Sequence, residues 1–185
     1  YAFNHQELLD RHRFGLDEAA QGIFHKTSRW APTTLPTPYT QDLDKAEDLL
    51  AEAGWEDSDE DGYLDNFVEL DDDFDGKIDG RKKVRFEFTI LTSNKQERID
   101  ICALLRENLE QIGIICNVKP VEFTTLQQLS RDHQFDAIFA GWGTGADPDT
   151  SENLWTTNAI DAGRNYGCYS SKIVDQLFED GKREL

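Results

Sequence analysis

The sequence predicts an α/β fold, built on a mainly parallel βαβαβ sheet with flanking helices. Residues 84–91 alternate strictly between polar and apolar side chains, which is typical of a half-buried strand. Residues 96–111 repeat apolar side chains at helical spacing, and residues 135–140 form the short apolar run of a buried strand. Strands that alternate with helices in this way favour parallel pairing.

Two helices are expected before the sheet. Residues 3–13 place apolar side chains among polar ones, and a loop with three prolines follows. Residues 43–53 form the second helix, for which Asp42 or Thr40 supplies the N-cap and Gly54 the stop signal.

The remaining elements follow from the same patterns. The helix over 96–111 ends at Gly113, where the second strand begins. After it we expect, in order, a strand over 114–121, a helix over 126–131, the strand over 135–140, a short helix over 151–155 and a helix from Ser171 onward.

The negative charge of the chain is concentrated in one segment. The formal net charge is −18, and residues 56–79 hold twelve of the acidic residues with Lys77 as their one base. An acidic chain repels phosphate backbones, and no basic stripe interleaved with aromatic residues is present, so nucleic-acid binding is not expected.

This acidic segment contains the same pattern twice, fourteen residues apart. The two copies are Asp57, Asp59, Asp61, Gly62, Asp65 and Asp71, Asp73, Asp75, Gly76, Asp79. Carboxylates at positions 1, 3 and 5 converge when the chain curls around one point, and a glycine at position 6 permits the turn, so the pattern predicts bound Ca²⁺. Position 7 would contribute the backbone carbonyls of Tyr63 and Lys77, and Asp65 and Asp79 would bind through water.

Neither copy is a complete EF-hand. Position 12, which should be a bidentate glutamate, is Val68 in one copy and Lys82 in the other. The loops resemble the DxDxDG calcium loops of dockerins and thrombospondin repeats, and we expect modest, roughly 10⁻⁴ to 10⁻³ M, affinity. The alternative is a solvated acidic hairpin whose Asp-Gly pairs only make turns.

The three cysteines give no sign of a metal site or a disulfide framework. Cys102, Cys116 and Cys168 are far apart and odd in number, so we expect free thiols packed as small apolar residues. No stretch approaches the ~20 apolar residues of a membrane span. The chain starts at Tyr1 and contains no methionine, which leads us to expect an internal fragment of a longer protein.

Six segments of the sequence share a resemblance to known proteins: residues 2–10, 44–55, 110–114, 118–122, 135–142 and 147–149. Together they resemble the solute-binding proteins of the oligopeptide, dipeptide and nickel importer family. The resemblance covers nearly the whole chain and keeps the order and approximate spacing of the family's segments.

This resemblance implies a lobe of a type II periplasmic binding protein, which is not an enzyme. Residues 1–185 would form a single partial lobe, with 56–80 as a calcium-loop-like insertion. The implied function is the capture of a peptide or other small solute between two lobes, for delivery to the membrane permease subunits of an ABC transporter. The implied location is extracytoplasmic, in the periplasm or as a cell-surface lipoprotein, with membrane association only through the transporter or a lipid anchor outside this chain.

The expected ligand wall is the loop over 141–149, because it leaves the carboxyl end of a parallel strand, where open α/β sheets bind ligands. Trp142 would pack on the ligand. The resemblance implies a carboxylate here that pairs with a peptide's amino terminus, but the corresponding residue is Gly145 and the nearest acid is Asp147. The candidate ligand-binding residues are therefore Trp142, Gly143, Gly145, Asp147, Asn165 and Tyr166.

Each of these residues also has a structural interpretation. Trp142 could be a core aromatic, residues 147–149 could be a turn that starts a helix, and Asn165 and Tyr166 could simply form a turn.

Two other classes of protein fit the sequence less well. Glycines 141, 143 and 145 lack the spacing of phosphate-binding loops, and no nucleophile or zinc-protease motif is present, so an enzyme is disfavoured. His5 and His12 share a helix face but lack a third metal ligand. A calcium-stabilised scaffold or adhesion module would explain the aspartate loops and leave the matched segments unexplained.

Overall fold

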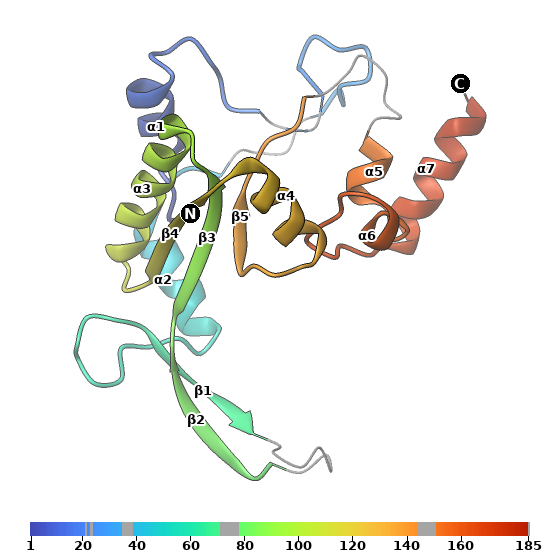
Figure 1. The fold of residues 1–185 in the computed structure, drawn as a ribbon. Coiled ribbons are helices and arrows are strands. Elements are labelled where there is room, and N and C mark those ends of the chain that lie inside the picture. Colours follow the sequence, from blue (N-terminus) through green and yellow to red (C-terminus); the bar gives the residue numbers. More distant parts are fainter. Residues whose placement is uncertain (21, 23, 35–38, 71–77, 144–150, 185) are drawn as a thin grey trace.

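The computed structural model describes residues 1–20, 22, 24–34, 39–70, 78–143 and 151–184. Its centre is a parallel sheet of β3 (Glu87–Ser93), β4 (Ile115–Val121) and β5 (Ala137–Phe139), in the order β4-β3-β5. Helix α3 (Gln96–Glu110) joins β3 to β4, and α4 (Phe123–Arg131) joins β4 to β5. The two helices lie on opposite sides of the sheet (Figure 1). The predicted parallel βαβαβ sheet is confirmed.

The core lies between the sheet and the helices packed on one of its faces. Ile90 of β3, Cys102 of α3 and Cys116 of β4 form one buried cluster. A second cluster joins Ala46 of α2 (Leu43–Glu52) to Ile112 and Ile114, at the turn between α3 and β4. Helix α3 buries Ile101, Cys102, Leu104 and Asn108, whereas α2 buries Ala46 and leaves Leu49 exposed.

The N-terminal helices begin at side-chain caps. Asn4 caps α1 (His5–His12) by accepting a 3.0 Å hydrogen bond from the backbone N–H of Glu7. Asp42 caps α2, so of the two expected caps it is Asp42 that fills this role. The helix stops before Gly54, whose φ of +83° is a conformation that favours glycine.

The strand expected over 84–91 is divided at Phe86. Residues 84 and 85 belong to β2 (Gly80–Arg85), which pairs with β1 (Asp65–Leu70) in an antiparallel hairpin, and β3 continues to Ser93. Phe86 makes the transition, because its N–H donates to Leu64 of the hairpin while its carbonyl accepts from Ile115 of the sheet. The hairpin extends away from the body of the chain (Figure 1).

The C-terminal part is helical. It contains α5 (Glu152–Trp155), α6 (Ala159–Ala162) and α7 (Lys172–Glu184), of which α6 was not expected. Asp175 of α7 accepts hydrogen bonds from the backbone N–H and the hydroxyl of Thr157, at 2.8 and 2.7 Å. These bonds favour the ionised carboxylate, so they hold the pKa of Asp175 below its ordinary value and tie α7 to the turn before α6.

The cysteines do not all behave as expected. Cys102 and Cys116 are buried, but Cys168 is exposed, so the expectation was wrong for Cys168. Cys168 lies in the turn between α6 and α7 rather than on the inward face of a helix or strand. Within the described ranges, no helix has the length and apolar character needed to cross a membrane.

Candidate functional site

The carboxyl ends of β3 and β5 meet at one edge of the sheet. The two strands are parallel, and Thr92 of β3 lies opposite Phe139 of β5 one residue before β3 ends. Directly after Phe139 the chain enters the loop that the sequence marks as the ligand wall. The loop therefore begins where parallel sheets form ligand crevices.

Trp142 lies on the surface of this edge. Its side chain is 41% exposed, and its ring centroid is 6.2 Å from that of Tyr166. A tryptophan with this exposure is not part of the core, so the alternative of a core aromatic is wrong. Gly143 is also exposed. Gly145 and Asp147 lie outside the described residues, and their ligand roles stay predictions.

Asn165 has a structural task. It is buried, and its side-chain amide donates to the carbonyls of Thr156 and Tyr169 at 3.0 and 2.7 Å. Its side-chain oxygen accepts from the N–H of Tyr169 at 3.1 Å. Asn165 thus braces the turn that presents Tyr166 to Trp142, and its hydrogen-bonding groups are used within the chain.

Arg98 lies at the same edge and was missed in the sequence. It occupies the first turn of α3, with its guanidinium carbon 5.9 Å from the centre of the Phe139 ring. One of its guanidinium nitrogens lies 3.7 Å from the position that a Cβ on Gly141 would take. No ion pair joins Arg98 to a carboxylate within the part of the chain that the structure describes. The N-terminus of α3 adds positive potential beside this guanidinium, and Glu97 in the same turn is paired with Arg13.

Ser93 is the second residue that was missed. It ends β3 and is 4% exposed, and its hydroxyl has no hydrogen-bond partner among the described residues. A buried polar group without a partner costs free energy, which makes such a group a mark of function. The sequence does contain a signal for Ser93, because this polar residue stands at the end of a predicted buried strand and shortly before a predicted helix.

A cavity of about 270 Å³ opens beside Phe139. Leu8 and Leu9 of α1 and Ile101 of α3 line it, together with polar residues of the segment that follows α1. Phe139 therefore contacts the guanidinium of Arg98 and also lines this cavity.

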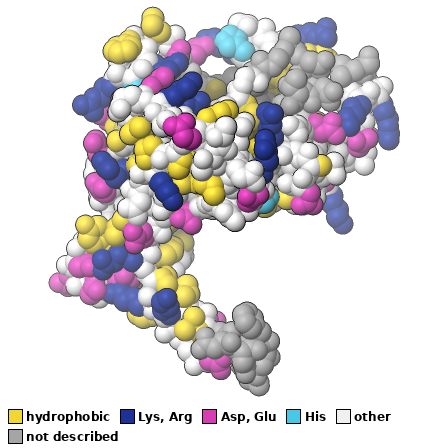
Figure 2. Space-filling view, viewed as in Figure 1, with side chains coloured by type: hydrophobic (Ala, Val, Ile, Leu, Met, Phe, Trp, Pro, Cys, Tyr) yellow, Lys and Arg dark blue, Asp and Glu magenta, His cyan; other side chains and the backbone are white. Residues whose placement is uncertain are grey.

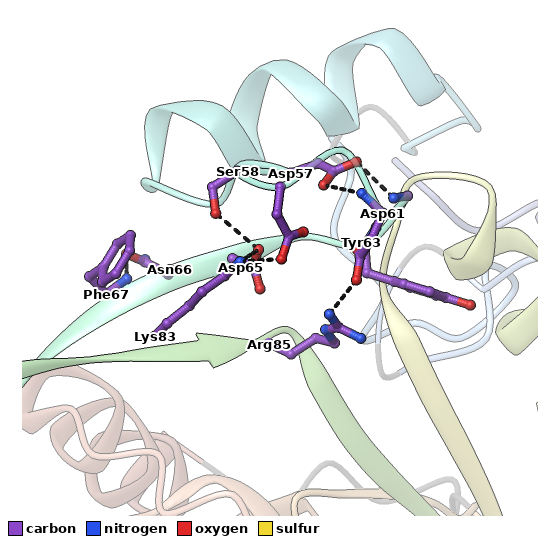
Figure 3. Close-up of polar contacts among 11 residues, drawn as sticks. Asp57, Ser58, Asp61, Tyr63, Asp65, Asn66, Phe67, Lys83 and Arg85 are labelled. Atoms are coloured by element: carbon purple, nitrogen blue, oxygen red, sulfur yellow. Dashed lines mark hydrogen bonds and ion pairs between the residues drawn. The ribbon is translucent and has the colours of Figure 1, made fainter.

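The first aspartate loop forms a compact turn at the base of the hairpin (Figure 3). Asp57 accepts hydrogen bonds from the backbone N–H groups of Asp61 and Gly62, at 3.1 and 2.8 Å. One carboxylate oxygen from each of Asp57, Asp59 and Asp61 lies within 4.8 Å of the other two. The convergence of positions 1, 3 and 5 is therefore present.

Basic side chains of β2 balance much of this charge. Lys83 contacts Asp59 at 2.6 Å and the buried Asp65 at 2.7 Å, and Arg85 pairs with Asp61. The hydrogen bond from Lys83 lowers the pKa of Asp65, and the bonds to Asp59 and Asp65 raise the pKa of Lys83. Figure 2 shows acidic and basic side chains side by side on this part of the hairpin.

The structure places the predicted metal ligands in different surroundings. Asp57, Asp59 and Asp61 could hold a cation together, whereas Asp65 is turned toward Lys83 and Ser58. Tyr63 follows this turn, and Asp79 adjoins β2 and donates its backbone N–H to Leu70. Asp71, Asp73, Asp75 and Lys77 lie outside the described residues. Calcium binding stays a prediction for both loops.

Calcium at millimolar concentration is expected to raise the melting temperature of the chain, and magnesium is expected to raise it less, because Mg²⁺ demands a stricter octahedral geometry. The Asp59→Asn variant should lose most of this rise. Glu69→Gln is the matched control, since Glu69 is paired with Arg81 on the same hairpin outside the cluster. If calcium left the melting temperature unchanged, the calcium prediction would be wrong, and Lys83 and Arg85 alone would neutralise the loop.

Comparison with known proteins adds a family match. Residues 1–163 match the model of the bacterial extracellular solute-binding proteins, family 5, middle region. The match includes both the carboxyl edge of the sheet and the hairpin.

Individual relatives agree with this match. The chain is 34% identical, over 141 residues, to the oligopeptide-binding protein AppA of Bacillus subtilis, an alignment that covers 75% of this chain and 23% of that protein. The solved structure of AppA in complex with a nonapeptide superposes with a TM-score of 0.80 at 29% identity, over 97% of this chain and 33% of that one. NikZ of Campylobacter jejuni, in complex with Ni(L-His), has the same fold, with a TM-score of 0.75 at 23% identity, over 97% of this chain and 33% of that one. The chain thus spans a quarter to a third of the length of these relatives.

Proposed function

Because this chain belongs to the bacterial extracellular solute-binding proteins, family 5, we propose that the full-length protein captures a peptide or a similar small solute for an ABC importer. This chain supplies much of one lobe, and the solute is held against the carboxyl edge of its sheet. The protein works outside the cytoplasm, in the periplasm or as a cell-surface lipoprotein, and it passes the solute to membrane permease subunits without chemical change.

The observation that carries this proposal is the chemistry of the edge. Trp142 offers an exposed aromatic surface. Among the described residues, the guanidinium of Arg98 has no ion-pair partner and the buried hydroxyl of Ser93 has no hydrogen-bond partner. A peptide supplies the matching groups, since it has apolar side chains, a carboxylate and backbone donors and acceptors. The scaffold alternative gains nothing from these features, because a scaffold has no use for an unpaired buried hydroxyl.

The proposal is tested by solute binding to the full-length protein, because the second lobe forms the other half of the cleft. Peptide pools of graded length are incubated with the protein, and retained species are identified by native mass spectrometry. We expect bound peptides at micromolar concentrations or below. Binding of no solute, or conversion of the solute into a product, would contradict the proposal.

Ser93→Ala is expected to change stability and binding in opposite directions. The hydroxyl has no partner among the described residues, so its removal relieves a desolvation cost, and the free energy of unfolding should stay equal or rise by about 1 kcal/mol. The same variant of the full-length protein should bind its solute several-fold more weakly. Urea unfolding and isothermal titration calorimetry measure the two effects, and Ser58→Ala serves as the control because Ser58 bonds to Asp65 far from this edge. A loss of stability without a loss of affinity would show that the hydroxyl serves the fold.

A further inference from the structure

The cavity beside Phe139 adjoins the proposed ligand surface. Phe139 is the last residue of β5, at the carboxyl edge of the sheet where the loop with Trp142 begins, and it lines the cavity. The same ring contacts the guanidinium of Arg98. A solute that lies against this edge would therefore also lie beside the cavity.

The deep part of the cavity is apolar. Leu8 and Leu9 of α1 and Ile101 of α3 line it together with Phe139, and Ala19 of the segment that follows α1 completes this apolar lining. Leu8, Leu9 and Phe139 are half-buried, and Ile101 is buried. Such a lining gains free energy when an apolar group replaces the water in contact with it.

The rest of the lining is polar and comes from His5, Arg13, Asp17 and Glu18. Most of these charges are already paired. Arg13 is paired with Asp17 and with Glu97 of α3, and Glu18 is paired with Lys26. A charged occupant would give up its hydration next to groups that already have partners, which is unfavourable. The lining therefore favours an uncharged, apolar occupant.

Two contacts fix the helices that form the walls. The backbone N–H of Asn4, at the start of α1, donates to the side-chain oxygen of Asn108 near the end of α3, at 2.9 Å. Arg13, just after α1, pairs with Glu97 in the first turn of α3. Helix α1 is thus tied to both ends of α3, so the cavity is pre-formed and an occupant does not have to open it.

The size of the cavity limits what it can hold. Its volume is about 270 Å³. Pockets that enclose a whole small ligand have roughly 300 Å³ or more, so this cavity suits one side chain rather than a complete solute. Phe14 and Leu16, the large apolar residues of the adjoining segment, are 79% and 86% exposed and therefore point into solvent instead.

We propose that this cavity receives one bulky apolar side chain of the bound peptide, so that the protein selects peptides with leucine, isoleucine or phenylalanine at one position. The inference rests on the proposed function, because it takes the solute to be a peptide held at this edge. Such a side chain buries several more apolar carbons than alanine does, which corresponds to about 10- to 100-fold in affinity.

The test presents the full-length protein with an equimolar library of randomised peptides, of the length best retained in the pool experiment. The retained peptides are sequenced by mass spectrometry and compared with the input. We expect leucine, isoleucine and phenylalanine to be enriched about tenfold or more over alanine at one position, and asparagine, which is close to leucine in size, to be depleted there. Retention of peptides without such a preference would overturn this inference and leave the proposed function standing. Retention of no peptide would remove both.

Variants that fill the cavity show whether it is the source of the preference. Ala19→Phe adds a ring from the segment after α1, and Leu9→Trp adds volume from the α1 wall, so the result does not depend on the orientation of one side chain. Both variants should reduce the enrichment at that position several-fold and shift it toward alanine and glycine. Ala20→Phe is the matched control, because Ala20 is exposed next to Ala19 and does not line the cavity.

Melting temperatures of the full-length variants confirm that they are folded. If both filled variants kept the preference of the parent protein, the preference would arise elsewhere on the ligand surface and the proposal would be wrong. It would also be wrong if Ala20→Phe changed the preference as much as Ala19→Phe did.

Discussion

Replacing Arg98 by alanine is expected to weaken solute binding by the full-length protein about 10- to 100-fold, the usual cost of losing a charge-assisted hydrogen bond. The guanidinium lies over Phe139 and beside Gly141, in the first turn of α3, without an ion-pair partner among the described residues. An anionic group of the solute, such as a peptide carboxylate, would therefore meet both this charge and the positive end of the helix.

Isothermal titration calorimetry with a peptide identified in the pool experiment measures this loss. Arg98→Lys should give an intermediate affinity, because it keeps the charge but loses the planar pair of donors. Arg106→Ala is the matched control, since Arg106 is on the same helix but is paired with Glu110. If the parent protein and Arg98→Ala bound the solute with equal affinity, Arg98 would have no part in solute binding, and its contact with Phe139 would be its whole role.

Ile90→Ala should produce the largest loss of stability, about 2 to 5 kcal/mol in the free energy of unfolding. Ile90 lies in the middle of the central strand, is 4% exposed and packs against Cys102 and Cys116. Truncation would leave a cavity that the strands on both sides cannot close.

Urea unfolding followed by far-UV circular dichroism measures this loss. Ile78→Ala is the matched control, because Ile78 is 58% exposed beside the hairpin and its truncation opens no cavity. We expect the control to cost below about 1 kcal/mol. If the two variants lost equal stability, the packing around Ile90 would not be the source of the effect.

The sequence predicted the sheet well because its elements are long or strongly periodic. Helix α3, strand β4 and the alternation of strands with helices that favours parallel pairing follow directly from the apolar pattern. Helix α6 was missed because its four residues are too few to show a helical period. The equally short α5 was expected only because residues 147–149 before it could form a turn that starts a helix. The division at Phe86 was missed for a different reason, since its alternation is continuous and only the change of hydrogen-bond partner reveals the break.

The candidate site was predicted less completely. Trp142 was recognised because an aromatic residue within a glycine-rich loop is conspicuous, and its exposure agrees with that interpretation. Arg98 and Ser93 were missed because a polar residue on a helix or at a strand end normally faces solvent. Their significance depends on what lies nearby, which only the folded chain establishes. For the same reason the lysine and arginine of β2 that neutralise the first aspartate loop could not be assigned in advance.

In the strand order β4-β3-β5, the part of the proposed ligand surface that follows β3 is held by more backbone pairing than the part that follows β5. Strand β3 is paired with β4 along all of its seven residues and with β5 near its end, so Ser93 and the start of α3 are anchored from both sides. Trp142 follows a strand of three residues whose only partner, in the described part of the chain, is β3. Insertions and substitutions should therefore cost less stability after β5 than after β3. Among related lobes that bind different solutes, sequence variation should accumulate in the loop that contains Trp142, while Ser93 and the start of α3 vary less.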